Sequence, residues 1–239
     1  MLLLMDERED TYLIKGDSEF HCRFGFIKKE VLAAAKPGDI LESNTKHKFR
    51  VIQPGMPDYI GKAKRGPQAV LPKDLGIIAS YTGIRSGSRV VDAGVGSGIL
   101  SMYLAHIVAP QKLVAYEVRE DFAEIAKSNF KKFGVDNIEV KIKSIYEGID
   151  EEELDLVSLD LPEPWLAVEP AYKALKTSGY LTSYSPSINQ NARFMDALQS
   201  RFQSYTIETL ERRWNMDAVR PSTQMIGHSG FITIARKLY

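Results

Sequence analysis

Cysteine is nearly absent from this sequence of 239 residues, which contains only Cys22. A single cysteine cannot form an internal disulfide, and no further cysteines or histidines surround it with the spacing of a metal site. We therefore expect a buried, unreactive thiol at Cys22 and no metal centre.

Long apolar runs are also missing. A membrane-spanning helix needs about 18 or more consecutive apolar residues, and the apolar residues 1–5 are followed at once by Asp6 and Glu7. That start is unlike a secretory signal. We expect a cytoplasmic protein that does not associate with a membrane.

The chain also lacks a net charge, because its 31 basic and 31 acidic residues balance. A neutral chain lacks the overall field with which some proteins coat nucleic acid non-specifically. Basic residues still cluster locally, at residues 46–48, 62–65, 131–132 and 212–213. These clusters fit either a local RNA-binding surface or ordinary solvated faces.

Two different patterns divide the sequence near residue 60. Residues 1–60 hold short strand-like segments, which predict a small β-rich domain. These segments are residues 2–5, 11–15, 39–43 and 48–53. Prolines and a glycine at residues 54–57 mark its end, and residues 61–72 have the composition of a polar connector. We assign residues 61–239 to a second domain.

Helices and apolar strands alternate from residue 73 onward, beginning with a helix at residues 73–82. Strands are expected at residues 89–92, 113–117, 138–142, 154–160, 180–184, 205–210 and 231–235. Short strands that are nearly all apolar, such as residues 156–159, suit a parallel sheet covered by helices on both faces. The pattern predicts a doubly wound α/β domain.

A glycine-rich turn with Gly94, Gly96 and Gly98 follows the first of these strands and precedes a helix. Glycines permit positive φ and the close approach of a ligand, although a tight turn without a ligand has the same composition. A dinucleotide-binding fingerprint needs its third glycine three positions after the second, where Ile99 stands. The spacing therefore favours a methyltransferase loop.

An acidic residue, Glu117, ends the next strand, where a carboxylate can accept hydrogen bonds from both hydroxyls of a ribose. The glycine turn carries no basic cluster for a pyrophosphate, which fits S-adenosylmethionine as the cofactor. Asp92, beside the turn, fits either a contact to the ammonium group of this cofactor or support of the turn through backbone hydrogen bonds.

Asp160 ends a later strand, at the same carboxyl edge of the sheet, and is followed by Pro162 and Pro164. A carboxylate here can accept a hydrogen bond from the exocyclic amino group of adenine, which leaves N1 facing the methyl donor. Adenine N1 is already a nucleophile, so positioning and charge stabilisation must supply the rate. We select Asp160 as the catalytic residue. Trp165 is a candidate for stacking on a base, with packing between helix and sheet as the alternative.

Together these segments closely resemble the tRNA (adenine-N1)-methyltransferases, which act on an adenine of the T-loop at position 58 and, in archaeal members, also at position 57. The landmarks are residues 64–68, 72–74, 92–98, 116–121, 160–165, 189–190, 219–221 and 227–231. The resemblance implies a class I, Rossmann-like methyltransferase fold with a small N-terminal β-domain. It also implies S-adenosylmethionine as cofactor, tRNA as partner and a homotetramer.

Pattern and resemblance together yield two sets of candidate site residues. The cofactor-binding candidates are Gln68, Asp92, Gly94, Val95, Gly96, Ser97, Gly98, Ile99, Leu100, Glu117, Phe122, Ser144 and Asp160. The RNA-binding candidates are Arg65, Trp165, Arg212, Arg213, Arg220 and His228. The arginines can pair with phosphates, or supply surface charge or subunit contacts, and His228 fits either an RNA contact or a structural role.

Three positions depart from the pattern of the family. Leu71 stands where members often have a tyrosine that can stack on the target base. Phe122 replaces a histidine and can pack against the cofactor's adenine, while Ser144 follows Lys143 in place of a glycine-aspartate pair and can still donate a hydrogen bond.

The leading functional hypothesis is methyl transfer from S-adenosylmethionine to N1 of a T-loop adenine, with Asp160 orienting the base. Two alternatives are a methyltransferase that acts on a protein or a small molecule, and a non-catalytic tRNA-binding subunit that retains the fold.

Overall fold

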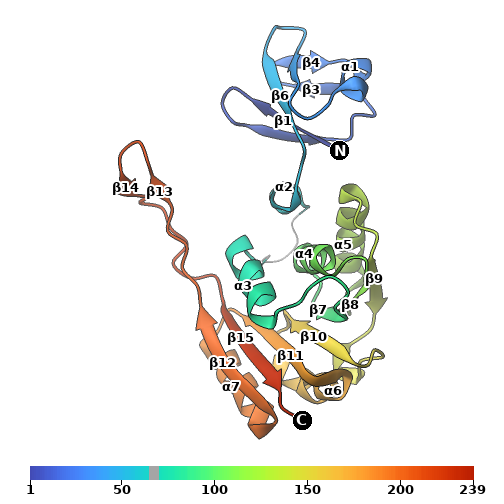
Figure 1. Cartoon of the computed structure of the whole chain (residues 1–239), viewed down its shortest axis with the longest axis vertical. Helices are drawn as coiled ribbons and strands as arrows, with labels where there is room; N and C mark the ends of the chain where they lie inside the picture. Colours follow the sequence, from blue (N-terminus) through green and yellow to red (C-terminus); the bar gives the residue numbers. More distant parts are fainter. Residues whose placement is uncertain (65–69) are drawn as a thin grey trace. The chain divides into compact units, whose positions relative to one another are not determined.

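A computed structural model describes residues 1–64 and 70–239, and the chain divides into two compact units, Met1–Ala63 and Lys64–Tyr239 (Figure 1). The division falls just after the sequence-predicted boundary near residue 60. None of the helices in the described residues combines the length and apolar character that a membrane span requires.

The N-terminal unit contains a four-stranded antiparallel sheet in the order β2-β1-β6-β5. Its strands are β1 (Leu2–Asp6), β2 (Thr11–Ile14), β5 (Ile40–Glu42) and β6 (Lys48–Ile52), as the sequence predicted to within a residue or two. Leu4, Phe49 and Val51 are fully buried on the inner face of this sheet, together with Leu32 of a short helix.

Four elements of this unit are missing from the sequence-based prediction. They are the hairpin of β3 (Phe20–Cys22) and β4 (Gly25–Ile27), and the helices α1 (Lys29–Ala34) and α2 (Met56–Lys62). The expected connector is wrong at its start, because α2 continues to Lys62. Pro57 lies in the first turn of α2, where its missing N–H costs nothing, and the amide of Gly55 donates to Asp58 at 2.8 Å. Cys22 is half-buried rather than buried.

The second unit is built on a seven-stranded sheet in the order β12-β15-β11-β10-β7-β8-β9. The strands are β7 (Val90–Ala93), β8 (Leu113–Glu117), β9 (Ile138–Ile142), β10 (Leu154–Leu159), β11 (Leu175–Ser185), β12 (Phe202–Glu208) and β15 (Phe231–Lys237). Strands β7 to β11 pair in parallel, but β15 is antiparallel to both of its neighbours. The sheet is therefore mixed and not wholly parallel, because β12 returns to β15 without a crossover helix.

Helices cover both faces of this sheet, as the doubly wound pattern requires. They are α3 (Pro72–Thr82), α4 (Ile99–Val108), α5 (Glu120–Phe133), α6 (Val168–Ala174) and α7 (Ile188–Leu198). Successive residues of a strand point to opposite faces. Asp92 of β7 bonds to Ser101 of α4, whereas its neighbour Val91 belongs to the cluster that includes α6.

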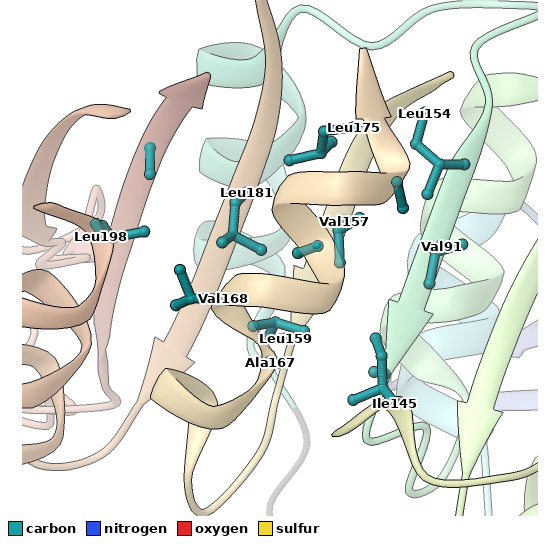
Figure 2. Close-up of a cluster of buried hydrophobic side chains, with 14 of the residues drawn as sticks. Val91, Ile145, Leu154, Val157, Leu159, Ala167, Val168, Leu175, Leu181 and Leu198 are labelled. Carbon is teal, nitrogen blue, oxygen red and sulfur yellow. The ribbon is translucent and has the colours of Figure 1, made fainter. Parts of the chain in front are cut away.

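A large cluster of buried side chains lies between the sheet and α6 (Figure 2). Val157 and Leu159 of β10 and Leu181 of β11 are each wholly buried and pack with Val168 of α6. Burying an aliphatic side chain of this size contributes about 1.5–3 kcal/mol. This core holds β10 firmly, and with it the loop that follows at Asp160.

A long excursion separates β12 from β15, and we call residues 209–230 the arm. It contains a small hairpin of β13 (Trp214–Asn215) and β14 (Arg220–Pro221) and extends away from the sheet in Figure 1. Several large apolar side chains of the arm are exposed, including Leu210, Trp214, Met216 and Val219.

Candidate active site

The turn between β7 and α4, residues 94–98, requires glycine at three positions, and we call it the glycine loop. Gly94, Gly96 and Gly98 all have positive φ, at 86°, 53° and 80°, a conformation that other residues adopt only with strain. A Cβ on Gly98 would overlap the ring of Phe130 in α5. The space above Gly96 is open, with no atom nearer than 4.0 Å to the position of a Cβ.

Gly94 also brings the glycine loop against the loop that follows β10. A Cβ at Gly94 would overlap the carbonyl oxygen of Asp160, and the amide of Asp160 donates to Ala93 at 2.8 Å. The backbones of β7 and β10 are therefore in direct contact at their carboxyl ends. The close approach places two candidate site segments, distant in sequence, side by side.

Glu117 ends β8 and is buried with its carboxylate facing backbone amides. One oxygen accepts from the amide of Gly96 at 3.2 Å and the other from the amide of Arg119 at 2.9 Å. A carboxylate has about four acceptor positions, so two remain after these bonds. Glu117 is thus held rigidly and can still accept hydrogen bonds from a ligand.

Asp92 lies at the end of β7 with 1% of its surface exposed. Ser101 of α4 donates to Oδ2 at 2.5 Å, whereas Oδ1 is buried without a hydrogen-bond partner among the described residues. Burial raises the pKa of Asp92 to about 7, and the nearby Glu117 adds to this shift. Asp92 therefore has an unsatisfied acceptor directly behind the glycine loop.

Asp160 begins the loop after β10, and its carboxylate is only partly exposed. Burial raises the pKa of Asp160 to about 7, with a smaller contribution from the negative charge of Asp92. The carboxylate makes no hydrogen bond to a side chain or amide in the part of the chain that the structure describes. Asp160 is therefore available to a donor that enters the site.

These segments enclose one cavity of about 490 Å³. Its walls come from the glycine loop, the end of β8, the start of α5, the Asp160 loop and the start of α7. The lining residues are Val70, Gly94, Val95, Gly96, Ser97, Ile99, Leu100, Glu117, Val118, Arg119, Phe122, Asp160, Leu161, Pro162, Tyr184, Pro186 and Gln190. The volume is that of an ordinary small-molecule site.

Most of the described cofactor-binding candidates line this cavity, but three of them do not. Gly98 packs on Phe130, and Asp92 lies behind the loop. Ser144 caps the short 3-10 helix η1 (Ile145–Glu147) through a 3.3 Å bond from the amide of Tyr146 and is not part of the cavity wall. Gln68 lies outside the described residues, as does the RNA-binding candidate Arg65.

Phe122 lines the cavity with one face already covered. The guanidinium of Arg119 lies 3.8 Å from the centre of the Phe122 ring. The same guanidinium pairs with Asp121 at 2.6 Å. Phe122 and Arg119 both line the cavity, so a planar ligand there can contact this pair.

The RNA-binding candidates fall into two places. Trp165 lies in the short 3-10 helix η2 (Pro164–Ala167), outside the cavity wall, with the guanidinium of Arg193 3.9 Å from its ring centre. Arg212, Arg213 and Arg220 are exposed on the arm, where Arg213 pairs with Glu211 at 2.8 Å.

His228 bridges the end of the arm to the cavity. Its Nδ1 lies 2.6 Å from Glu208 and its Nε2 lies 3.0 Å from the carbonyl oxygen of Pro186, which lines the cavity. The hydrogen bond to Glu208 raises the pKa of His228. Because two acceptors face the ring, the doubly protonated imidazolium satisfies both.

Several lining residues are absent from the sequence-based site, above all Tyr184, Pro186 and Gln190. Tyr184 and Pro186 lie at the carboxyl end of β11, next to β10, so the rule that ligands bind at the carboxyl edge of parallel strands would have indicated them. Gln190 belongs to a landmark of the family but had no assigned role.

Comparison with known proteins places this geometry in a family. The model of the family "tRNA methyltransferase complex GCD14 subunit" matches residues 62–223. The chain is 37% identical to the tRNA (adenine(57)-N(1)/adenine(58)-N(1))-methyltransferase TrmI of Methanocaldococcus jannaschii, over 98% of this chain and 94% of the relative. It is 31% identical to the tRNA (adenine(58)-N(1))-methyltransferase TrmI of Thermus thermophilus, over 99% and 96% of the two chains.

Solved structures agree in fold over the full length. A protein of Thermotoga maritima, described as a SAM-dependent O-methyltransferase, superposes with a TM-score of 0.90 and 32% identity, covering 100% of this chain and 92% of the other. TrmI of Aquifex aeolicus superposes with a TM-score of 0.83 at 23% identity, covering 100% and 96%. The chain belongs to the tRNA methyltransferase family that contains the GCD14 subunit and the archaeal and bacterial TrmI enzymes.

Proposed function

We propose that the chain transfers a methyl group from S-adenosylmethionine to N1 of adenine 58 in the T-loop of tRNA. One observation carries the assignment of the site: the carboxylate of Asp160, which has no hydrogen-bond partner among the described residues, shares a cavity with the glycine loop and Glu117. Family membership supplies the class of substrate, since the curated TrmI relatives are tRNA (adenine-N1)-methyltransferases.

The residues of the cavity fit this cofactor. Open space above Gly96 leaves room for a ligand against the backbone of the glycine loop. The free acceptor positions of Glu117 suit the two ribose hydroxyls, and the ring of Phe122 in the cavity wall suits contact with the adenine ring. The unpartnered Oδ1 of Asp92 supplies negative charge near the positively charged amino-acid end. When bound, the cofactor supplies an electrophilic methyl group on a sulfonium.

The chain's own contribution to the reaction is to orient the acceptor and stabilise charge. Asp160 accepts a hydrogen bond from the exocyclic amino group of adenine, which leaves N1 unprotonated and facing the cofactor side of the cavity. Positive charge spreads over the purine as N1 is alkylated, and an adjacent carboxylate in a site of low polarity stabilises it. Adenine N1 needs no base to remove a proton, so one ionised carboxylate is sufficient.

The direct test incubates the protein with unmodified tRNA and isotopically labelled cofactor, and then maps the label by nuclease digestion and mass spectrometry. The proposal expects N1-methyladenosine at position 58. The same digest shows whether adenine 57 is a further acceptor. Label on guanine, on cytosine or on another part of the tRNA would reject the assignment.

Replacing Asp160 tests its catalytic role. We expect Asp160→Ala to lower kcat for tRNA methylation by about 10²- to 10³-fold, because a preorganised electrostatic contact to the transition state is lost. Cofactor affinity, measured by calorimetry, should change little. Glu163→Gln is the matched control, since Glu163 is an exposed carboxylate of the same loop outside the cavity wall. Equal rates for wild type and Asp160→Ala would remove Asp160 from the mechanism.

A second candidate is transfer to an oxygen atom of a small molecule or protein, because the similar Thermotoga maritima structure is described as an O-methyltransferase. Oxygen acceptors must lose a proton, and the carboxylate of Asp160, with its raised pKa, is suited to take it. Labelled cofactor with tRNA absent separates the two: an O-methyltransferase retains its activity on the non-RNA acceptor.

We also propose a homotetramer that works in the cytoplasm. Exposed apolar side chains on the arm, among them Leu210 and Trp214, support burial in a subunit interface, since monomeric proteins rarely expose such groups together. Sedimentation velocity would measure the assembly, and fractionation of cells would measure the location.

A further inference from the structure

Gln190 has an unusual position in the wall of the cavity. It lies in the first turn of α7 and lines the same space as Asp160. Its Nε2 donates to the carbonyl oxygen of Pro162 at 2.9 Å, while its Oε1 is buried without a hydrogen-bond partner in the described residues. A buried acceptor left without a donor costs about 1–3 kcal/mol, so a ligand that supplies a donor there gains affinity.

The orientation of this amide follows from its partner. The carbonyl of Pro162 can only accept, so the NH₂ of Gln190 must face it, and the opposite orientation would set two oxygen atoms against each other. Pro162 also lies two residues after Asp160. The hydrogen bond therefore ties the side chain of Gln190 to the loop of Asp160 and fixes the position of Oε1.

Asp160 and Gln190 both line the cavity, and each carries an acceptor without a partner among the described residues. Such a pair suits a ligand group with two N–H donors. The exocyclic amino group of adenine has two hydrogens, whereas guanine and hypoxanthine carry a carbonyl oxygen at the same position. An oxygen facing Asp160 and Gln190 would be repelled by both. A site built to bond an amino group rejects analogues without it strongly, because its own polar groups then remain unpaired.

We propose that Gln190 reads the acceptor base: its Oε1 accepts one N–H of the adenine amino group while the carboxylate of Asp160 accepts the other. The assignment rests on the proposed function and adds a specificity-determining residue to it. The apolar side chains of Leu161, Pro162 and Pro186 also line this cavity.

The test is a cycle in which residue and base are changed separately. Two full-length tRNAs are prepared, one with adenosine at position 58 and one with purine riboside, which lacks the amino group. Gln190→Met keeps the size of the side chain and removes its oxygen. Asn189→Ala is the matched control, because Asn189 is the exposed neighbour in α7 and does not line the cavity. Thermal unfolding of both variants confirms that they fold.

On the adenosine substrate we expect Gln190→Met to lower kcat/KM by about ten- to a hundredfold. On purine riboside, wild type and Gln190→Met should agree within about twofold, and Asn189→Ala should behave as wild type on both. Equal losses on the two substrates, or no loss on adenosine, would overturn the role of Gln190. If the wild type methylates neither tRNA, the proposed function itself fails, and the role of Gln190 with it.

Discussion

Two buried acidic residues in the site lower the stability of the folded protein. Asp92 has a buried oxygen without a partner, and Asp160 has a carboxylate without a hydrogen bond to the described residues. Burial raises the pKa of each to about 7, which means that the folded protein resists their ionised forms. Residues that destabilise a fold and await a cationic or donating ligand are typical of functional sites.

This cost predicts a pH-dependent gain in stability for Asp160→Asn. The folded pKa of Asp160 is about 7 and its ordinary value is 3.8, so the folded state holds a proton that the unfolded state releases. Stability is therefore lost as the pH rises from about 4 to 7 and stays lost above 7. Asparagine carries no charge to desolvate. We expect the variant, without cofactor, to melt at least about 2 °C above wild type at pH 8.

Calorimetry at pH 8 and pH 4 measures the effect. The difference between Asp160→Asn and wild type should shrink at pH 4, where the carboxyl is protonated in the folded state and partly protonated in the unfolded state as well. Glu163→Gln serves as the control, because Glu163 is exposed in the same loop and lies outside the cavity wall. A variant that is less stable than wild type at pH 8 would contradict the raised pKa of Asp160.

Sequence reasoning located the cavity-lining residues that a local pattern marks. Gly94, Glu117 and Asp160 each follow an apolar strand, and the carboxyl ends of parallel strands meet at one edge. Gln190 has no such mark, because it reaches the cavity only through the placement of α7 beside Pro162. Ser144, predicted from the resemblance, caps a short helix instead of lining the cavity.

At the scale of elements, the start of α3 holds the two ends of the arm. Lys73 is nearly buried, and its ammonium group donates to Asp74, to Thr209 and to Ser229 at 2.6–2.9 Å. Asp74, fully buried, also accepts from the hydroxyls of Thr209 and Ser229. The carbonyl of Ser229 then accepts from Tyr184, which lines the cavity. The Pro-Lys-Asp landmark of the sequence thereby links the arm to the site.

For a buried ion pair of this kind we expect the effects of two mutations on the free energy of unfolding to be strongly non-additive. Asp74→Leu leaves the ammonium of Lys73 buried and unpaired, which should cost about 3–5 kcal/mol in the free energy of unfolding. Lys73→Met leaves the carboxylate of Asp74 buried and unpaired and should cost a similar amount. The double variant removes both charges and should recover a large part of the loss. Urea unfolding measures all three.

An exposed pair provides the control for this cycle. Lys127 and Glu124 lie 3.0 Å apart on the surface of α5, and exposed pairs contribute at most about 1 kcal/mol. The cycle on these two residues should show little coupling. If the double variant at Lys73 and Asp74 loses as much stability as the two single variants together, the buried charges do not depend on each other.

At the scale of the molecule, periodicity predicted the α/β architecture well and the connections poorly. Alternating apolar strands and helices are local properties, so β7 to β10 were located to within a residue. The reversal of β15 depends on the arm, whose residues have no regular apolar period. The start of α2 was missed because a proline in the first helical turn has the composition of a loop.

A neutral protein that binds tRNA must concentrate its basic groups locally. Arg212, Arg213 and Arg220 are exposed on the arm, in a chain whose net charge is zero. Each guanidinium that pairs with a phosphate releases a counterion when tRNA binds, so the affinity should fall with salt in proportion to the number of such contacts. We therefore expect mutations in the arm to change how tRNA affinity depends on salt.

Replacing all three arm arginines by glutamine should weaken tRNA binding and reduce the slope of log K against log salt by roughly 2–3, since each lost phosphate contact removes about 0.7–0.9. Fluorescence anisotropy between 50 and 200 mM salt, concentrations over which such contacts weaken strongly, measures the slope. Cofactor affinity should not change, because the arm supplies no residue to the cavity wall. Glutamine at the exposed Lys112, Lys127 and Lys173 removes the same charge elsewhere. If that control variant lowers the slope as much as the arm variant does, net charge and not the arm governs the binding of tRNA.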